Sequence, residues 1–249
     1  MESITSLPLP WEFLSKPAEH ITKQIIDFRA ANIAEYEKCY AAVIDGAFSA
    51  EECKTLISAA EAHAKGKWEP AMVNVGNGLQ QYSPRIRNHE RIIWDDHVII
   101  GKIWDRLKDQ VPEIQRIEHQ VRNSHTELNV PKVVFTATRL NERMRFLRYT
   151  GGQYFKQHED GSYSTPDGEE RSHYTLHLYL NDSREMEGGA TVFYSDDDKV
   201  EYKVQPKVGR VLIFQHEQLF HSGEDVDGGV KYTLRTDLMF KREVFREQS

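Results

Sequence analysis

From about residue 131 onward, the chain is a series of short segments rich in β-branched and aromatic residues. Gly-Gly, Asn-Asp, Asp-Gly and Pro-Lys pairs separate these segments, and such pairs are typical of turns. Because no helical segment intervenes, a parallel sheet of β-α-β units is not expected. The pattern predicts an all-β sandwich or barrel. Its strands are expected at Lys132–Ala137, Arg145–Tyr149, Thr175–Leu180, Ala190–Tyr194, Glu201–Val204, Arg210–Phe214 and Tyr232–Phe240.

The residues before 131 are expected to form elements that pack against this sheet and support it. The apolar pattern of Ile21–Ile33 indicates a short amphipathic helix, and Cys39–Asp45 reads as a buried strand. A capping box at Ser49–Glu52 starts one helix, and a second helix is expected over about Asp96–Val111. We therefore expect a single domain over residues 1–249. Its parts are a leader (1–38), a helical support region (39–130) and a β core (131–245).

The composition restricts the function classes. Lys and Arg number 32 against 39 Asp and Glu, so the formal charge is −7, and no basic block is present to bind a phosphate backbone. No nucleic-acid partner is therefore expected. No stretch approaches the ~18 apolar residues of a membrane span, and the start lacks the apolar run of a secretory signal. The two cysteines, Cys39 and Cys53, match neither a disulfide framework nor a zinc motif, which predicts a reducing, cytosolic location.

One motif carries chemistry. His158 and Asp160 lie two residues apart, so both project from the same face of an extended strand. His221 follows 63 residues later, just past an apolar strand. Two imidazoles and one carboxylate form the facial triad that binds Fe(II) and leaves coordination positions open. A His-x-Asp pair alone is more often an ordinary surface or core feature. His216 is a rival third ligand, ranked lower because it continues the preceding strand.

A 2-oxo acid chelated to such an ion needs a cation for its far carboxylate. Lys231 and Arg235 provide two, and both share one face of the last strand with Thr233. We favour Arg235, since burying its guanidinium also buries Asp237, a carboxylate that could pair with it. Lys231 stays open as the alternative, nearer the strand end and solvent. A strand arginine is more often part of a surface salt bridge, so its burial is expected only because the triad precedes it.

These segments carry a resemblance. From about Arg139 to Phe240 the chain resembles the 2-oxoglutarate/Fe(II)-dependent dioxygenases, specifically their prolyl-4-hydroxylase-like branch. The resemblance implies an α+β fold, with a double-stranded β-helix (jelly-roll or cupin-like) core buttressed by N-terminal helices. The segments that carry it are RFLRYTGGQYFKQHEDGSY, YTLHLYLND, EGGATVFY, VQPKVGRVLIFQH, LFHSGEDV and GGVKYTLRTDLMF.

The resemblance also implies an activity. Such an enzyme hydroxylates, or otherwise oxidises, an unactivated C–H bond and releases succinate and CO₂. Its cofactors are Fe(II), 2-oxoglutarate and O₂, with ascorbate as a further candidate. The family arrangement implies His158, Asp160 and His221 as the catalytic iron ligands. For 2-oxoglutarate it implies Tyr149 and Tyr179, together with Lys231 or Arg235, and it places His177 at the same cavity.

The substrate is left open between a small molecule, an amino acid and a prolyl-type peptide. Residues 82–91 and 161–171 are the expected rims of the pocket. Within the first rim, Arg87, Asn88 and Arg91 could hold a carboxylate or another polar group, and His173 and His177 are further substrate candidates. Two other functions stay open: a nucleic-acid demethylase of the same chemistry, which the −7 charge disfavours, and a non-catalytic β-barrel binding module, which the intact triad disfavours. No membrane partner is expected.

Overall fold

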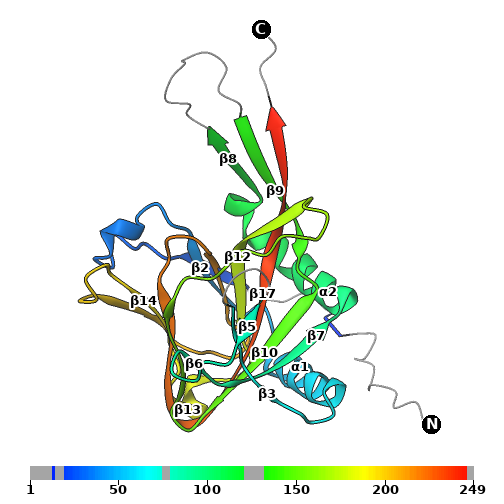
Figure 1. The fold of residues 1–249 in the computed structure, drawn as a ribbon, viewed down its shortest axis with the longest axis vertical. Coiled ribbons are helices and arrows are strands. Elements are labelled where there is room, and N and C mark those ends of the chain that lie inside the picture. Colours follow the sequence, from blue (N-terminus) through cyan, green and yellow to red (C-terminus); the bar gives the residue numbers. More distant parts are fainter. Residues whose placement is uncertain (1–12, 15–19, 75–78, 121–131, 246–249) are drawn as a thin grey trace, which may run out of the picture.

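The computed structural model describes residues 13–14, 20–74, 79–120 and 132–245. Two antiparallel sheets share one long strand, β17 (Figure 1). The larger sheet has the strand order β1-β2-β16-β12-β17-β10-β7-β3. Its strands are β1 (Thr22–Ile25), β2 (Ala41–Asp45), β16 (Val211–Gln215), β12 (Glu170–Tyr179), β17 (His221–Phe245), β10 (Arg143–Thr150), β7 (Glu90–Asp95) and β3 (Glu69–Pro70).

The smaller sheet is built on the first third of β17. There β17 pairs with β14 through residues 221–223 and with β11 through residues 221–226. Side chains from both sheets line one interior cavity. The strands of this sheet besides β17 are β6 (Arg87–Asn88), β11 (Gln153–His158), β13 (Met186–Gly188), β14 (Thr191–Tyr194) and β15 (Glu201–Val204); a separate hairpin joins β4 (Val73–Asn74) to β5 (Gln80–Gln81).

Strand alternation gives the larger sheet an apolar outer face and a polar inner face. On β12, Leu176 and Leu178 are fully buried in the main apolar cluster, together with Leu56 and Ile103 of the two helices. The intervening His177 points to the other face and lines the cavity. Burying each such leucine contributes about 1.5–3 kcal/mol. The helices therefore cover the outer face, and the inner face is left for the site.

The two helices begin where the sequence predicts. Helix α1 (Ala50–His63) has the expected capping box: Ser49 Oγ accepts from the Glu52 N–H at 3.1 Å, and the Glu52 carboxylate accepts from the Ser49 N–H at 2.8 Å. Helix α2 (His97–Leu107) is capped by the Asp96 carboxylate, which accepts from two backbone N–H groups. It ends four residues before Val111, because the chain tightens into short 3₁₀ turns at Lys108–Gln110 and Pro112–Ile114.

The first part of the chain corrects two expectations. The predicted amphipathic helix over Ile21–Ile33 is wrong: Thr22–Ile25 forms β1, which pairs with β2 at the edge of the larger sheet. Tertiary pairing there outweighs a weak helical pattern. Residues 39–130 are also less helical than expected, because β2 and β7 join the larger sheet, and α1 and α2 are the only α-helices among the described residues of this range. The described residues 20–38 thus contribute to the sheet and to an apolar cluster that includes Phe28 and Phe193, whereas Phe13 packs in the main apolar cluster.

The predicted β strands are present, several of them longer than expected. The last one begins at His221 instead of Tyr232, and β12 begins at Glu170 instead of Thr175. Strands β8 (Arg116–Gln120) and β9 (Lys132–Leu140) extend with the end of β17 as a projecting ribbon (Figure 1). Within the described ranges, no helix is both long and apolar enough to cross a membrane.

Candidate metal centre

Two neighbouring strands of the smaller sheet bring the predicted triad together. His158 ends β11, His221 begins β17, and the two residues are direct partners in the antiparallel register. Their ring centroids lie 4.4 Å apart. Asp160 follows β11, and its carboxylate oxygens lie 3.7 Å from His158 Nε2 and 3.8 Å from His221 Nε2. One possible ligand atom from each residue therefore falls within 4.8 Å of the other two, a spacing that can hold a metal ion.

The protonation of the two imidazoles suits metal binding. His158 Nδ1 lies 2.7 Å from the Lys156 carbonyl, and His221 Nδ1 lies 3.0 Å from the Leu219 carbonyl. A carbonyl accepts, so both Nδ1 atoms carry a proton, which in a neutral ring leaves the Nε2 lone pair for a metal ion. Burial lowers the pKa of His221 to about 3, which keeps that ring neutral. Two neutral imidazoles and a carboxylate are the donor set of a facial Fe(II) site.

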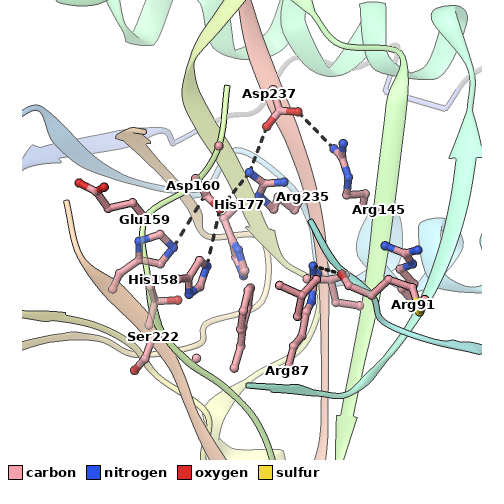
Figure 2. A pocket seen from close by; sticks show the side chains of 18 of the residues that line it. Arg87, Arg91, Arg145, His158, Glu159, Asp160, His177, Ser222, Arg235 and Asp237 are labelled. Carbon is pink, nitrogen blue, oxygen red and sulfur yellow. Dashed lines mark hydrogen bonds and ion pairs between the residues drawn. The ribbon is translucent and has the colours of Figure 1, made fainter. Parts of the chain in front are cut away.

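The carboxylate of Asp160 is held in its ionised form. Burial opposes ionisation, but the Arg235 guanidinium, whose Nη2 lies 3.0 Å from Oδ1, holds the pKa of Asp160 well below its usual range. The Thr175 hydroxyl donates to the other oxygen at 2.5 Å. Arg235 also lies 3.2 Å from Asp237, so the pair predicted from the sequence is present. Asp237 in turn accepts from Arg145 Nη1 at 3.2 Å (Figure 2).

Beside the triad lies a cavity of roughly 530 Å³, within the size range of small-molecule sites. Its wall carries several basic side chains, and Figure 2 shows Arg87, Arg91 and Arg145 on the side opposite His158 and Glu159. A stack of rings leads from that wall to the triad: the Arg87 guanidinium lies 4.6 Å from the Phe155 ring centroid, and Phe155 stacks on His158 at 3.6 Å. The rim predicted at residues 161–171 contributes Gly161, Ser162 and Tyr163.

The two candidate cations on β17 have different surroundings. Arg235 is engaged by two carboxylates, those of Asp160 and Asp237. Lys231 is 2% exposed and lines the cavity, yet it forms no ion pair with any carboxylate in the described part of the chain. Its Nζ lies 5.1 Å from the ring centroid of Tyr149, its register partner on β10. Burial lowers the pKa of Lys231 to about 7. The expectation that Lys231 lies nearer solvent is therefore wrong.

The remaining predicted residues divide into two groups. Tyr149, His177, Arg87 and Arg91 line the cavity, and the side chain of His177 has a buried Nε2 with no hydrogen-bond partner among the described residues. Thr233 is fully buried on the inner face and does not line the cavity. Asn88 does not line it either.

The expectations for Tyr179 and His173 need correction, whereas the lower rank given to His216 agrees with the structure. The Tyr179 hydroxyl donates to Thr191 at 2.7 Å, so it is already used, and Tyr179 does not line the cavity. His173 packs against Phe135 and Phe240, away from the cavity, because a register shift interrupts β12 between residues 172 and 174. His216, the rival ligand, is buried near Asp237 and outside the metal-binding cluster.

Sequence reasoning missed Arg145 and Phe155 as cavity residues. Arg145 shares the parity of Tyr149 on β10, so the alternation of that strand could have found it. Phe155 had no comparable signal, because the register of β11 shifts twice before His158 and obscures which side chains point inward.

Comparisons with known proteins agree with this geometry. Residues 144–236 match the family model of the 2OG-Fe(II) oxygenase superfamily. The chain matches no curated protein. Similar solved structures include a prolyl-4-hydroxylase from Pseudomonas putida, which is 16% identical with a TM-score of 0.54, over 85% of this chain and 98% of that one. Another is a prolyl hydroxylase from Trichoplax adhaerens in complex with a hypoxia-inducible-factor peptide, also 16% identical, with a TM-score of 0.52 over 85% of this chain and 90% of that one.

The fold and the family match together define the class of protein. The larger and smaller sheets form the expected double-stranded β-helix, with a minor contribution from the helices. Residues 144–236 match the 2-oxoglutarate/Fe(II) oxygenases on a prolyl-4-hydroxylase-like fold, so the activity is that of an oxidoreductase that uses Fe(II), 2-oxoglutarate and O₂. The resemblance stated from the sequence is confirmed.

Proposed function

We propose that His158, Asp160 and His221 hold the iron of this dioxygenase, and that Lys231, with Tyr149, holds its 2-oxoglutarate. The observation that carries the proposal is a converging metal donor set beside a buried lysine without a carboxylate partner in the described structure. When bound, iron and 2-oxoglutarate supply the oxidising chemistry, in which O₂ converts 2-oxoglutarate to succinate and CO₂ and a substrate C–H bond to C–OH.

Three side chains that already converge would hold the metal. The Nε2 lone pairs of His158 and His221 face the Asp160 carboxylate, and the backbone carbonyls at Lys156 and Leu219 fix both rings through Nδ1. Arg235 takes a positioning role in this proposal: its Nη2 forms ion pairs with both Asp160 and Asp237.

Lys231 replaces Arg235 as the proposed partner of the far carboxylate. An ammonium buried without a counter-ion is unfavourable, and an incoming carboxylate would remove that penalty. Arg235 already has two carboxylates, so a third anion would gain little there. The Tyr149 hydroxyl can donate a second hydrogen bond, since burial raises the pKa of Tyr149 to about 12 and keeps the phenol protonated. The role expected for Tyr179 passes to Tyr149 alone.

The test measures the binding of 2-oxoglutarate to the Fe(II)-loaded protein without oxygen. The visible charge-transfer band of the chelate reports this binding. Lys231→Met should weaken 2-oxoglutarate binding by about 30-fold or more, because it removes one partner of a buried charge pair. Lys207→Met is the control, since Lys207 is an exposed lysine paired with Asp45. Arg235→Gln should instead weaken iron binding, measured separately by metal titration. Full 2-oxoglutarate affinity in Lys231→Met would overturn the assignment.

We propose that the substrate is a small molecule, an amino acid or a prolyl-type peptide. The structural neighbours named as prolyl hydroxylases support the last of these only through the shared fold. We further propose that the described strands act as one oxygenase domain, supported by the single sheet that β1, β2, β7 and β17 share. A cytosolic location is proposed from Cys39 and Cys53, which are both buried and unpaired.

A further inference from the structure

The cavity has a charge opposite to that of the whole chain. The described residues lining it include six basic side chains, Arg87, Arg91, Arg143, Arg145, Lys231 and Arg235. They include only three carboxylates, Glu159, Asp160 and Asp237. The chain as a whole carries a formal charge of −7. Positive charge is therefore concentrated around the triad, where the substrate must lie.

Pairing accounts for some of these cations. Arg143 forms two hydrogen bonds with Asp95, at 2.9 and 2.8 Å. Arg235 and Arg145 share Asp237. Lys231 has its role in the proposed 2-oxoglutarate site. Two of the six cations, the arginines at 87 and 91 in the first rim, are thus explained neither by an ion pair among the described residues nor by the co-substrate.

Arg87 and Arg91 have only neutral hydrogen-bond partners in the described structure. Arg87 donates to His89 Nε2 at 2.8 Å and to the Met72 carbonyl at 3.1 Å. Arg91 is 9% exposed and donates to the Gln80 side chain at 2.7 Å. Neither guanidinium uses its full set of donors, and a buried guanidinium without a counter-ion is unfavourable.

The strand register places Arg145 close to Arg91. Arg91 on β7 lies directly opposite Leu147 on β10, and Arg145 is two residues from Leu147 on the same face. Burial and the neighbouring charge of Arg145 both lower the pKa of Arg91. Burial is also the main cause that lowers the pKa of Arg87 to about 10, with further contributions from Arg235 and Arg91. An anion between these side chains would relieve their mutual repulsion.

We propose that Arg87 and Arg91, backed by Arg145, form a subsite for a carboxylate of the primary substrate. The substrate is then a small organic acid, and its apolar part would lie against Leu147, Met72 and Ile86 of the same cavity. This inference rests on the proposed function, because the subsite gains its meaning from the triad beside it. Guanidinium groups bind carboxylates in bidentate fashion, which fixes orientation as well as affinity.

The first experiment needs no knowledge of the substrate. The probe is sulfate, titrated at constant ionic strength into protein that holds Fe(II) and saturating 2-oxoglutarate under nitrogen. Sulfate at ten times its dissociation constant should raise the melting temperature by roughly 3 °C. Arg91→Gln should lose this response, and Arg91→Lys should keep part of it. Arg148→Gln should keep all of it, because Arg148 lies on the other face of β10 and pairs with Glu90.

The outcomes separate this inference from the proposed function. Saturating 2-oxoglutarate occupies Lys231, so a sulfate response that disappears on adding 2-oxoglutarate belongs to Lys231 and overturns the subsite. An equal response in Arg91→Gln and wild type overturns it as well. If the proposed function is wrong, the charge-transfer band will instead be absent from the wild-type protein before any sulfate is added.

The second experiment identifies the anion. Free amino acids and small organic acids are compared with their amides, and with uncharged proline-containing peptides, by the succinate they release. Acids should exceed their amides by about tenfold or more in kcat/KM, and Arg91→Gln should raise KM for the acid at unchanged KM for 2-oxoglutarate. Amides or uncharged peptides that match the acids would overturn the inference.

Discussion

The outer and inner faces of the larger sheet differ in what their side chains require. Leu178, Phe146 and Leu234 on the outer face are buried in one apolar cluster with the helices, and their packing is complete within the fold. On the inner face, Lys231 has no counter-ion among the described residues, and buried His177 Nε2 has no hydrogen-bond partner there. The outer face therefore supplies stability, whereas the inner face retains unfavourable groups that a bound ligand can satisfy.

The largest expected effect comes from removing a metal ligand of the inner face. His158→Ala should reduce succinate formation by roughly 1,000-fold or more, because two ligands cannot hold the ion in place. The melting temperature should change little, since His158 is at the end of β11 and partly exposed. Succinate release and iron titration measure the two effects.

The matched control for His158→Ala is His97→Gln. His97 is exposed at the start of α2, outside the cavity. Comparable activity in His158→Ala and His97→Gln would contradict the ligand assignment.

Leu178→Ala tests the outer face and should give the opposite combination. It removes a fully buried side chain and should lower the free energy of unfolding by about 2–5 kcal/mol, a fall in melting temperature of about 2–4 °C for each kcal/mol. The 2-oxoglutarate affinity of the remaining folded protein should stay close to wild type. Thermal unfolding and ligand titration at low temperature separate the two quantities, and a weakened affinity would show that the faces are coupled.

The pH dependence of 2-oxoglutarate binding tests whether a protonated lysine on the inner face binds this ligand. Lys231 must be protonated to hold a carboxylate, and burial lowers its pKa to about 7 in the ligand-free protein. Affinity should therefore fall above pH 7, approaching tenfold per pH unit. Lys231→Arg should flatten this slope. An unchanged slope in Lys231→Arg would assign it to another group.

The same lysine gives a stability change of defined sign. Its pKa is lower in the folded state than in the unfolded chain, where it is about 10.4, so between these values the unfolded chain binds more protons. The contribution of Lys231 to ligand-free stability should then rise as pH increases from 7 to 10. The charge of Glu224 opposes this pKa shift, while Tyr149 and Tyr179 face Lys231 as neutral rings. Comparing wild type with Lys231→Met across this pH range isolates the contribution.

The sequence predicted the parts of the molecule that depend on local pattern. The capping box at Ser49 and the β segments depend on neighbouring residues, and both are present. The triad was predictable because its chemistry demands particular residue types at a strand end, although its convergence depends on the pairing of His158 with His221. The prolyl-4-hydroxylase-like resemblance supplied the expected fold before any contact was known.

What the sequence could not decide was the partner of each charged group. Arg235 and Lys231 share one strand face, so alternation alone places both inward. The sequence predicts Asp237 as a partner of Arg235, but only the fold shows that Asp160, in a loop after β11, engages Arg235 as a second carboxylate. The helix expected over Ile21–Ile33 failed for a related reason, because β2, the strand that β1 joins, is itself paired with β16, a segment far along the chain.

The weakest effect is predicted for Arg143, which lies in the cavity wall like Arg91 but differs from it in pairing. Arg143 is bound by Asp95 through two hydrogen bonds, whereas Arg91 has only Gln80. Arg143→Gln should therefore change the rise in melting temperature that sulfate causes in the Fe(II)- and 2-oxoglutarate-loaded protein by less than about threefold. It should change the free energy of unfolding by less than about 1 kcal/mol, as for other exposed ion pairs. Arg91→Gln should abolish the response in the same titration. If both variants lose it equally, total charge governs anion binding in this cavity, and the distinction between paired and unpaired cations fails.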